Sequence, residues 1–290
     1  NQAIKLNPKL DWAIASRGLT YLLMKRYEEA LQDFNQAIEL DPELAGAIAS
    51  RGQTYQSMKR YEEALQDFNH AVELNPKLAK AIASRGLTYQ SMKRYEEALQ
   101  DFNRAVELDP KLDWATASRG ETYRLMERYE EALQDFNRAI ELNPKYDWAI
   151  ASRGLTYLFM KRYEEALQDF NRAIELDPDD WWFYNRAITH KVMGQLEQAQ
   201  TDLNQALSLA QTAYTKEPEN WDITFNLALY YLAANKDEQA KHYYRDALRR
   251  VAPIPDIQFA LQDLEDFLMV FPNDRLGRLV QQVLQKRLAQ

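Results

Sequence analysis

The 290-residue chain contains no cysteine, only eight glycines and three histidines. The lack of cysteine excludes disulfide bonds, thiol catalysis and cysteine-ligated zinc. No stretch approaches the roughly 18 apolar residues of a membrane-spanning helix, and we find no segment that combines a basic start with an apolar middle, as a secretion leader does. We therefore expect a cytoplasmic protein that has no membrane partner.

Positive charge is also in short supply. The chain carries 36 Lys and Arg against 44 Asp and Glu, which gives a formal net charge of −8. Binding to nucleic-acid backbones needs clustered basic residues that acids do not offset, so a nucleic-acid partner is disfavoured. The 46% of hydrophobic residues is typical of a folded protein and too high for a disordered one.

Residues that could support catalysis or bind a metal are equally scarce. His70, His190 and His242 lie far apart and lack the spacing of metal ligands. The pair Glu28 and Glu29 recurs every 34 residues, which indicates acids at the start of a helix and not an acid–base dyad. There is no phosphate-binding glycine loop and no serine elbow. The sequence thus predicts no catalytic residue, no cofactor site and no metal site.

The sequence does contain a segment that recurs along the chain. The stretch from Arg162 to Pro178 has near copies that end at Pro42, Pro76, Pro110 and Pro144. The accompanying glycines are 34 residues apart, at Gly18, Gly52, Gly86, Gly120 and Gly154. A fixed period of this length indicates stacked supersecondary units instead of a closed globule.

Each repeat has the pattern of two amphipathic helices. In the first complete repeat, apolar and small residues recur at steps of three and four, which predicts two helices with a turn from Met24 to Tyr27. Pro42 is expected to follow the second helix, because proline cannot continue it. Small Gly18 and Ala30 are expected where the two helices cross.

These positions resemble the tetratricopeptide repeat, in which a large residue, Gly, Tyr, Ala, Phe, Ala and Pro stand at set intervals. The matching residues of the first repeat are Ile14, Gly18, Tyr21, Ala30, Phe34, Ala37 and Pro42. The array is similar to bacterial tandem members of the family, and the resemblance implies an all-α fold, a right-handed α-solenoid of stacked helix-turn-helix units with a C-terminal helical cap.

One departure from the family pattern lies in the turn, where the family often has glycine. This chain has Lys25, Lys59, Lys93, Glu127 and Lys161 there. If the backbone is left-handed at these places, each non-glycine residue costs about 1 kcal/mol.

The predicted domain organisation has four parts. Residues 1–9 match the end of a repeat, so we expect more repeats or another domain upstream, and residues 10–178 hold five near-identical repeats. Residues 179–252 hold two divergent repeats, the first with a second helix that runs on to Glu217. Residues 253–290 are predicted to form two capping helices, Asp256 to Phe271 and Asn273 to Leu288, with polar outward faces.

Two residue types recur together in six repeats. An arginine stands directly before the glycine position and an aspartate stands in the second helix, as in Arg85 and Asp101. In the seventh repeat both change, to Leu227 and Tyr243, which predicts a direct, partly buried ion pair. Ser16 and Asn35, with their copies, are expected to form hydrogen bonds between helices.

Other positions vary between repeats, on the side of the first helix that lines the concave groove in tetratricopeptide arrays. They hold Trp, Leu or Phe in some repeats and Gly, Gln, Ser or Lys in others. Because the fold tolerates the polar versions, we expect the apolar ones to contact a partner. The predicted groove residues are Trp12, Leu19, Leu22, Trp114, Glu121, Arg124, Trp148, Leu155, Leu158, Phe159, Trp181, Tyr184, Ile188 and Lys191.

The predicted function is a non-catalytic protein–protein interaction module that binds a peptide or a partner helix in this groove, as the docking or sensor part of a larger protein. An inert spacer or oligomerisation scaffold, a sensor that regulates a missing NTPase or protease domain, and a nucleic-acid binder stay open as alternatives, as does the oligomeric state. Carboxylate-clamp members of the family have Lys and Asn where this chain has Ala15 and Leu19, so binding of an acidic chaperone tail is not expected.

Overall fold

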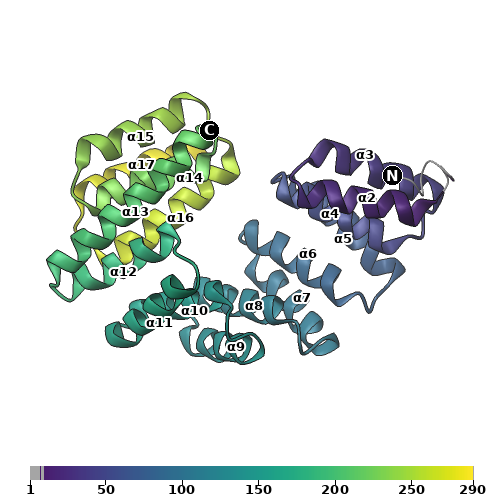
Figure 1. Cartoon of the computed structure of the whole chain (residues 1–290), viewed down its shortest axis with the longest axis horizontal. Coiled ribbons are helices and arrows are strands. Elements are labelled where there is room, and N and C mark those ends of the chain that lie inside the picture. Colours follow the sequence, from purple (N-terminus) through teal and green to yellow (C-terminus); the bar gives the residue numbers. More distant parts are fainter. Residues whose placement is uncertain (1–6, 8–9, 290) are drawn as a thin grey trace. The chain divides into compact units, whose positions relative to one another are not determined.

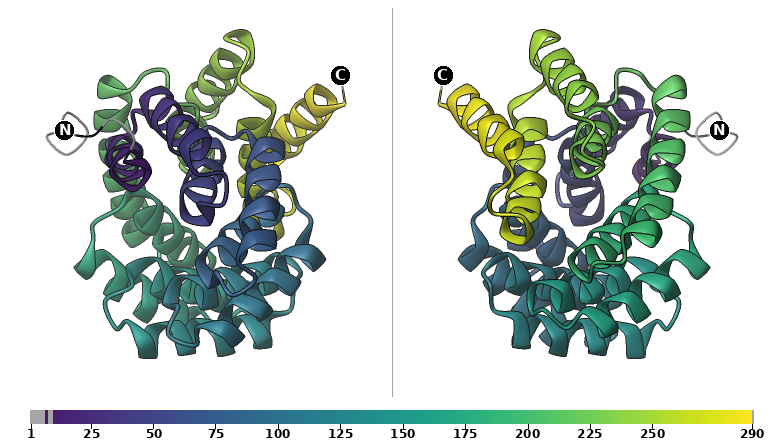
Figure 2. Two further views of the ribbon diagram at one scale, coloured as in Figure 1. Left: turned by 90° about the vertical axis from the view of Figure 1, so that its right-hand side faces the viewer. Right: turned by 90° about the vertical axis from the view of Figure 1, so that its left-hand side faces the viewer.

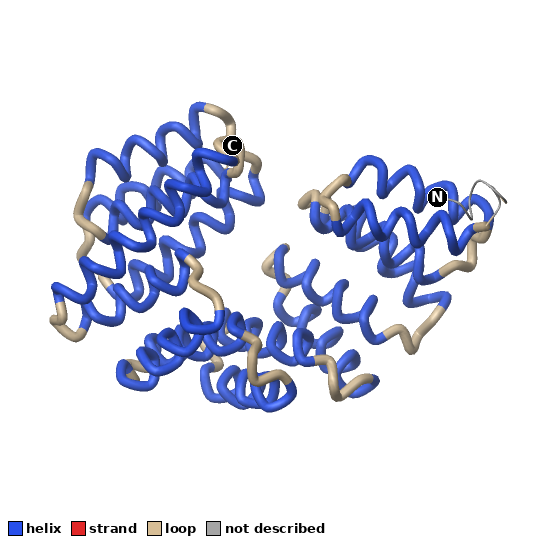
Figure 3. Tube along the Cα trace, viewed as in Figure 1, coloured by secondary structure: helices blue, strands red, loops and turns tan. Residues whose placement is uncertain are grey.

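The computed structural model describes residue 7 and residues 10–289, and these residues form sixteen α-helices and no strand (Figures 1 and 3). The expected end of a repeat at residues 1–9 lies outside the described residues, apart from Asn7. The chain divides into two compact parts, Asn1–Asn143 and Pro144–Gln290. None of the described helices has the length and apolar character needed to cross a bilayer.

The N-terminal part consists of four helix pairs. Their bounds are α2 (Asp11–Leu23) with α3 (Tyr27–Leu40), α4 (Ala45–Ser57) with α5 (Tyr61–Leu74), α6 (Ala79–Ser91) with α7 (Tyr95–Leu108), and α8 (Asp113–Leu125) with α9 (Tyr129–Leu142). Within this part, each first helix packs on its own second helix, which packs on the first helix of the next pair. The predicted all-helical fold of paired helices is thereby confirmed.

The C-terminal part continues with three pairs and a final hairpin. The pairs are α10 (Asp147–Phe159) with α11 (Tyr163–Leu176), α12 (Asp180–Val192) with α13 (Leu196–Lys216), and α14 (Trp221–Ala233) with α15 (Asp237–Arg249). The hairpin is α16 (Ile254–Val270) with α17 (Arg275–Leu288), drawn in yellow tones in Figure 2. The predicted extension of the second helix in the sixth repeat is confirmed, because α13 has 21 residues.

The hairpin differs in one respect from the predicted cap. Its helices begin and end within two residues of the predicted bounds, and α16 packs on α14. The expectation of polar outward faces holds only in part. Arg278, Gln282 and Lys286 of α17 are exposed, but so are Met269 on α16 and Leu279 and Val283 on α17, at 50%, 56% and 44%. The positions that face the core follow the apolar periodicity, but this periodicity does not determine what the opposite face carries.

The core of each near-identical repeat centres on one phenylalanine. The five fully buried phenylalanines are Phe34, Phe68, Phe102, Phe136 and Phe170. In the third repeat, a Cβ atom placed on Gly86 would lie 3.1 Å from Cε1 of Phe102 and 3.3 Å from the carbonyl oxygen of Ala98. Glycine at this helix crossing lets the two helices approach closely, as the sequence predicted.

The turn between the two helices of each near-identical repeat contains one residue in the left-handed region. The φ angle is 56° at Lys25, 58° at Glu127 and 60° at Lys161, while Gly194 of the sixth repeat has 75°. In the first repeat, the turn is closed by a hydrogen bond from the backbone N–H of Arg26 to the carbonyl of Tyr21. The five repeats therefore keep a strained non-glycine residue where glycine would fit without strain.

Replacing Lys25 and Glu127 together by glycine is expected to stabilise the N-terminal repeats by about 1 kcal/mol, because relief of left-handed strain at both turns exceeds the entropy that glycine adds to the unfolded chain. Urea unfolding followed by circular dichroism measures the change. The matched control replaces Lys77 and Lys111 by glycine, since both are exposed and neither has positive φ. A stability loss at the turns as large as in the control would contradict the prediction.

Candidate functional site

In the first six repeats, an ion pair inside the repeat holds the first helix against the second. In the third repeat, Nε and Nη2 of Arg85 donate to the two carboxylate oxygens of Asp101 at 2.7 and 2.6 Å. Five further pairs have the same arrangement: Arg17–Asp33, Arg51–Asp67, Arg119–Asp135, Arg153–Asp169 and Arg186–Asp202. The predicted contact between this arginine and this aspartate is confirmed.

The same arginine also links neighbouring repeats. Nη1 of Arg85 donates to Oδ1 of Asn69, in the second helix of the preceding repeat, at 2.8 Å. Equivalent bonds join Arg51 to Asn35, Arg119 to Asn103 and Arg186 to Asn171. The prediction for asparagine is thus confirmed. For serine it is confirmed at Ser84, whose Oγ accepts from Nε2 of Gln53 on the preceding first helix at 3.4 Å, and wrong at Ser16, whose hydroxyl donates to the carbonyl of Trp12 in its own helix at 2.7 Å.

Two of the predicted groove residues in the first repeat are exposed. The side chains of Trp12 and Leu19 are 58% and 42% exposed. Leu22 is half-buried and packs against the core cluster around Phe34. Trp114 of the fourth repeat is also half-buried and packs against a core cluster that includes Phe102 and Ala105 of the third repeat.

Glu121 and Arg124 pair with each other on α8. Nε and Nη2 of Arg124 donate to the two carboxylate oxygens of Glu121 at 2.9 and 2.7 Å. The side chains of Arg124 and Glu121 are only 6% and 17% exposed. The pair is therefore part of the packed interior and offers little surface to a partner.

The position of Leu22 serves packing between repeats. In the second repeat it is occupied by Gln56, whose Nε2 donates to Oγ1 of Thr88 at 3.0 Å and to the carbonyl of Ser84 at 3.2 Å on the next first helix. Gln90 makes the same two contacts with the fourth repeat. Variation between repeats predicts that this position is free of structural demand, but its polar residues are hydrogen-bonded across the helix interface.

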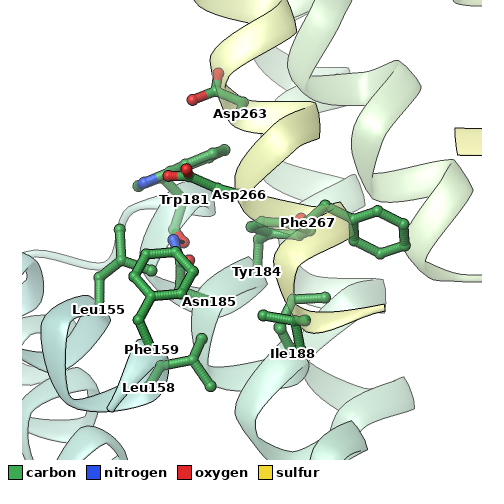
Figure 4. Close-up of a pocket in the computed structure, with 11 residues that line it drawn as sticks. Leu155, Leu158, Phe159, Trp181, Tyr184, Asn185, Ile188, Asp263, Asp266 and Phe267 are labelled. Atoms are coloured by element: carbon green, nitrogen blue, oxygen red, sulfur yellow. Dashed lines mark hydrogen bonds between the residues drawn. The ribbon is translucent and has the colours of Figure 1, made fainter. Parts of the chain in front are cut away.

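In the C-terminal part, α10, α12 and α16 line a largely apolar cleft (Figure 4). Its space amounts to about 280 Å³, counting the region open to solvent. The lining residues are Leu155, Leu158 and Phe159 of α10, Trp181, Tyr184, Asn185 and Ile188 of α12, and Asp263, Asp266, Phe267 and Val270 of α16. The structure therefore brings six of the predicted groove residues together and adds a third wall that sequence reasoning missed.

The predicted residues of the cleft divide into two groups by burial. Leu158, Tyr184 and Ile188 are each 3% exposed and form the packed floor. The half-buried residues Leu155, Phe159 and Trp181 have part of their surface left for contact.

A stack of aromatic rings supports one end of the cleft. The rings of Trp181 and Tyr184 have centroids 5.1 Å apart, and those of Tyr184 and Tyr230 are 5.0 Å apart. The hydroxyl of Tyr230 donates to a carboxylate oxygen of Asp180 at 2.8 Å. Burial raises the pKa of Tyr184 and of Tyr230, so both phenols stay neutral and the stack provides a rigid wall.

Two further predicted residues, Lys191 and Trp148, do not line the cleft. The amino group of Lys191 donates to the carbonyl of Ala233 at 2.7 Å and lies 5.2 Å from the ring centre of Phe271. Burial lowers the pKa of Lys191. Lys191 thus connects α12 to the end of α14 and to the residue after α16, while Trp148 packs beside Tyr146, with ring centroids 5.9 Å apart.

Residues that could bind a metal do not gather in the described part of the chain. His70 and His242 are exposed, and Nδ1 of His190 lies 2.5 Å from Oε1 of Gln195. Among residues 7 and 10–289, no group of three or more His, Asp or Glu side chains could hold a metal ion.

Paired helices stacked on their neighbours, with an apolar cleft between first helices, define the class of helical-repeat interaction modules. The model of the tetratricopeptide repeat family matches residues 12–44, 45–78, 79–112, 115–146 and 148–180, and a second tetratricopeptide repeat model matches residues 181–251. The chain belongs to the tetratricopeptide repeat family, which supports a role in protein–protein interaction.

Several solved structures share this fold. A tetratricopeptide repeat protein from Parabacteroides merdae is 18% identical with a TM-score of 0.64, and the match covers 95% of this chain and 98% of that one. PilW, a type IV pilus biogenesis factor, is 18% identical with a TM-score of 0.64, over 69% and 93% of the two chains. The Pseudomonas aeruginosa protein pilF is 21% identical with a TM-score of 0.58, over 72% and 93%. A search among curated proteins found no match.

Proposed function

We propose that this chain is a non-catalytic module that binds a peptide or a partner helix on its first helices. It would serve as the docking or sensor part of a larger cytoplasmic protein. The observation that carries the proposal is the cleft of α10, α12 and α16, where Leu155, Phe159 and Trp181 are half-buried apolar side chains at its opening. Partly exposed aromatic anchors in a preformed pocket are typical of protein-binding hot spots.

Comparison between repeats supports a binding role for Phe159. The equivalent residues in the second and third repeats are Ser57 and Ser91, and the hydroxyl of Ser57 donates to the carbonyl of Gln53 within its own helix. The helix pair therefore forms with serine at this position. An aromatic ring at Phe159 adds apolar surface that the paired helices do not require, which favours contact with a partner.

The proposal is tested by selecting dodecapeptides from a random library on the full chain and measuring the affinity of the most enriched one by fluorescence anisotropy. Phe159→Ser is expected to weaken that peptide's binding about tenfold, the cost of removing one hot-spot anchor. The variant should fold, because serine occupies this position in two other repeats.

The matched control is Leu23→Ser, at the same position of the first repeat, where the leucine is 79% exposed. This variant is expected to leave the affinity unchanged. Failure to enrich any peptide would favour an inert spacer over a binding module. Equal affinities for both variants and the original chain would mean that the peptide binds outside the cleft, which would contradict the proposed site.

A further inference from the structure

We propose that the cleft selects partners in which a lysine or arginine lies within one helical turn of a large apolar side chain, because α16 gives the apolar opening an acidic rim. This inference rests on the proposed function and specifies the chemistry of the partner. The occupant is a segment of a separate protein, and its basic residue would lie against α16 while its apolar residue contacts Phe159 and Trp181.

The rim consists of Asp263 and Asp266. Three residues apart, they lie on one face of α16, and both are half-buried residues of the cleft lining. Figure 4 shows both carboxylates on the side of the cleft where Trp181 lies, with Leu158 and Ile188 at the opposite side. The acidic groups are therefore confined to one side of the opening, next to an aromatic residue.

The electrostatics of the cleft favour a cation at this rim. Among the described residues that line the cleft, only these two aspartates carry charge. Their charges act on the floor as well, because the two carboxylates add to the effects of burial and of Tyr244, which raise the pKa of Tyr184. Near an apolar wall, the attraction between opposite charges is several times stronger than in bulk water, so a basic residue placed here would gain affinity.

Other charged groups near the cleft do not reverse its sign. Lys191, about one helical turn after Ile188 in α12, donates to the carbonyl of Ala233 and lies over the ring of Phe271. Asp180, which accepts the hydroxyl of Tyr230, adds a further acid behind the aromatic stack. With a net charge of −8 for the whole chain, the overall field also attracts basic and repels acidic segments.

The test uses the most enriched dodecapeptide from the library and a second version in which every lysine and arginine is replaced by glutamine. On the original chain, the glutamine version is expected to bind about tenfold more weakly, and raising the salt from about 50 to 300 mM should reduce the difference. On Asp263→Asn/Asp266→Asn, the two versions should bind with nearly equal affinity. The control variant Glu197→Gln/Asp237→Asn removes two exposed acids outside the cleft and should keep the difference.

The possible outcomes separate this inference from the proposed function. If enriched peptides lack basic residues, or the asparagine variant keeps the tenfold difference while Phe159→Ser still weakens binding, the acidic-rim proposal is overturned and the groove function stands. If no peptide is enriched, both fail. Self-association that Asp263→Asn/Asp266→Asn abolishes would show that a second copy fills the cleft, and would overturn the assignment of a separate partner.

Discussion

Phe102→Ala is expected to lower the free energy of unfolding of the N-terminal repeats by about 3–5 kcal/mol, the usual cost of emptying a fully buried phenylalanine site. Phe102 has no exposed surface, and its ring packs against the backbone of Gly86. The cavity cannot collapse easily, because the ion pair between Arg85 and Asp101 holds the two helices in register beside it. The loss should therefore lie at the upper end for a substitution of this kind.

Hydrogen exchange measured by mass spectrometry locates this loss along the chain. Because each repeat contacts only its neighbours, protection should fall most in α6 and α7 and less in α2 and α3. The control is Phe259→Ala on α16, where the phenylalanine is 39% exposed, and its cost should be about 1 kcal/mol or less. If both substitutions cost the same, the repeat core does not depend on Phe102.

The fold could be predicted because its rules are local. Each helix pair is encoded by a period of three and four residues, and each repeat needs only the next one to bury its apolar face. The place of α16 follows no such rule. The apolar stripe of Ile257, Leu261 and Leu264 predicts that one face of α16 is buried. This stripe does not indicate that Asp266 and Phe267, on another side of the helix, line a cleft with α10 and α12.

The site was predictable only in part, for a related physical reason. Variation between repeats shows where the fold tolerates several side chains, but tolerance does not mean that a side chain is free. Gln56 occupies the position that holds Leu22 in the first repeat and Leu158 in the fifth. The side-chain amide of Gln56 donates a hydrogen bond to Thr88 of the next repeat, whereas a leucine at this position fills the same interface by packing. The same interface between repeats can therefore be filled either by a hydrogen-bonded polar residue or by a packed leucine. For this reason, the residue types at a variable position do not show whether it lies in an interface or in an open groove.

Asp101→Ala is expected to destabilise the N-terminal repeats by about 1–3 kcal/mol, because it leaves the guanidinium of Arg85 without its two carboxylate acceptors. The side chains of Arg85 and Asp101 are only 17% and 7% exposed, so water replaces the lost bonds poorly. Removing both charges with Arg85→Met/Asp101→Ala should cost less than the sum of the two single changes, since no buried charge is then left unpaired.

Urea unfolding of the two single variants and the double variant gives the coupling energy between the two residues. A matched exposed pair is Arg138 and Glu141, whose side chains are 54% and 68% exposed, and Glu141→Ala should change stability by about 0.5 kcal/mol or less. If Asp101→Ala costs no more than Glu141→Ala, water already satisfies Arg85. The recurrence of this arginine–aspartate pair in six repeats would then need a cause other than stability. The hydrogen bond from Arg85 to Asn69 of the preceding repeat would likewise add nothing to the packing of one repeat on the next.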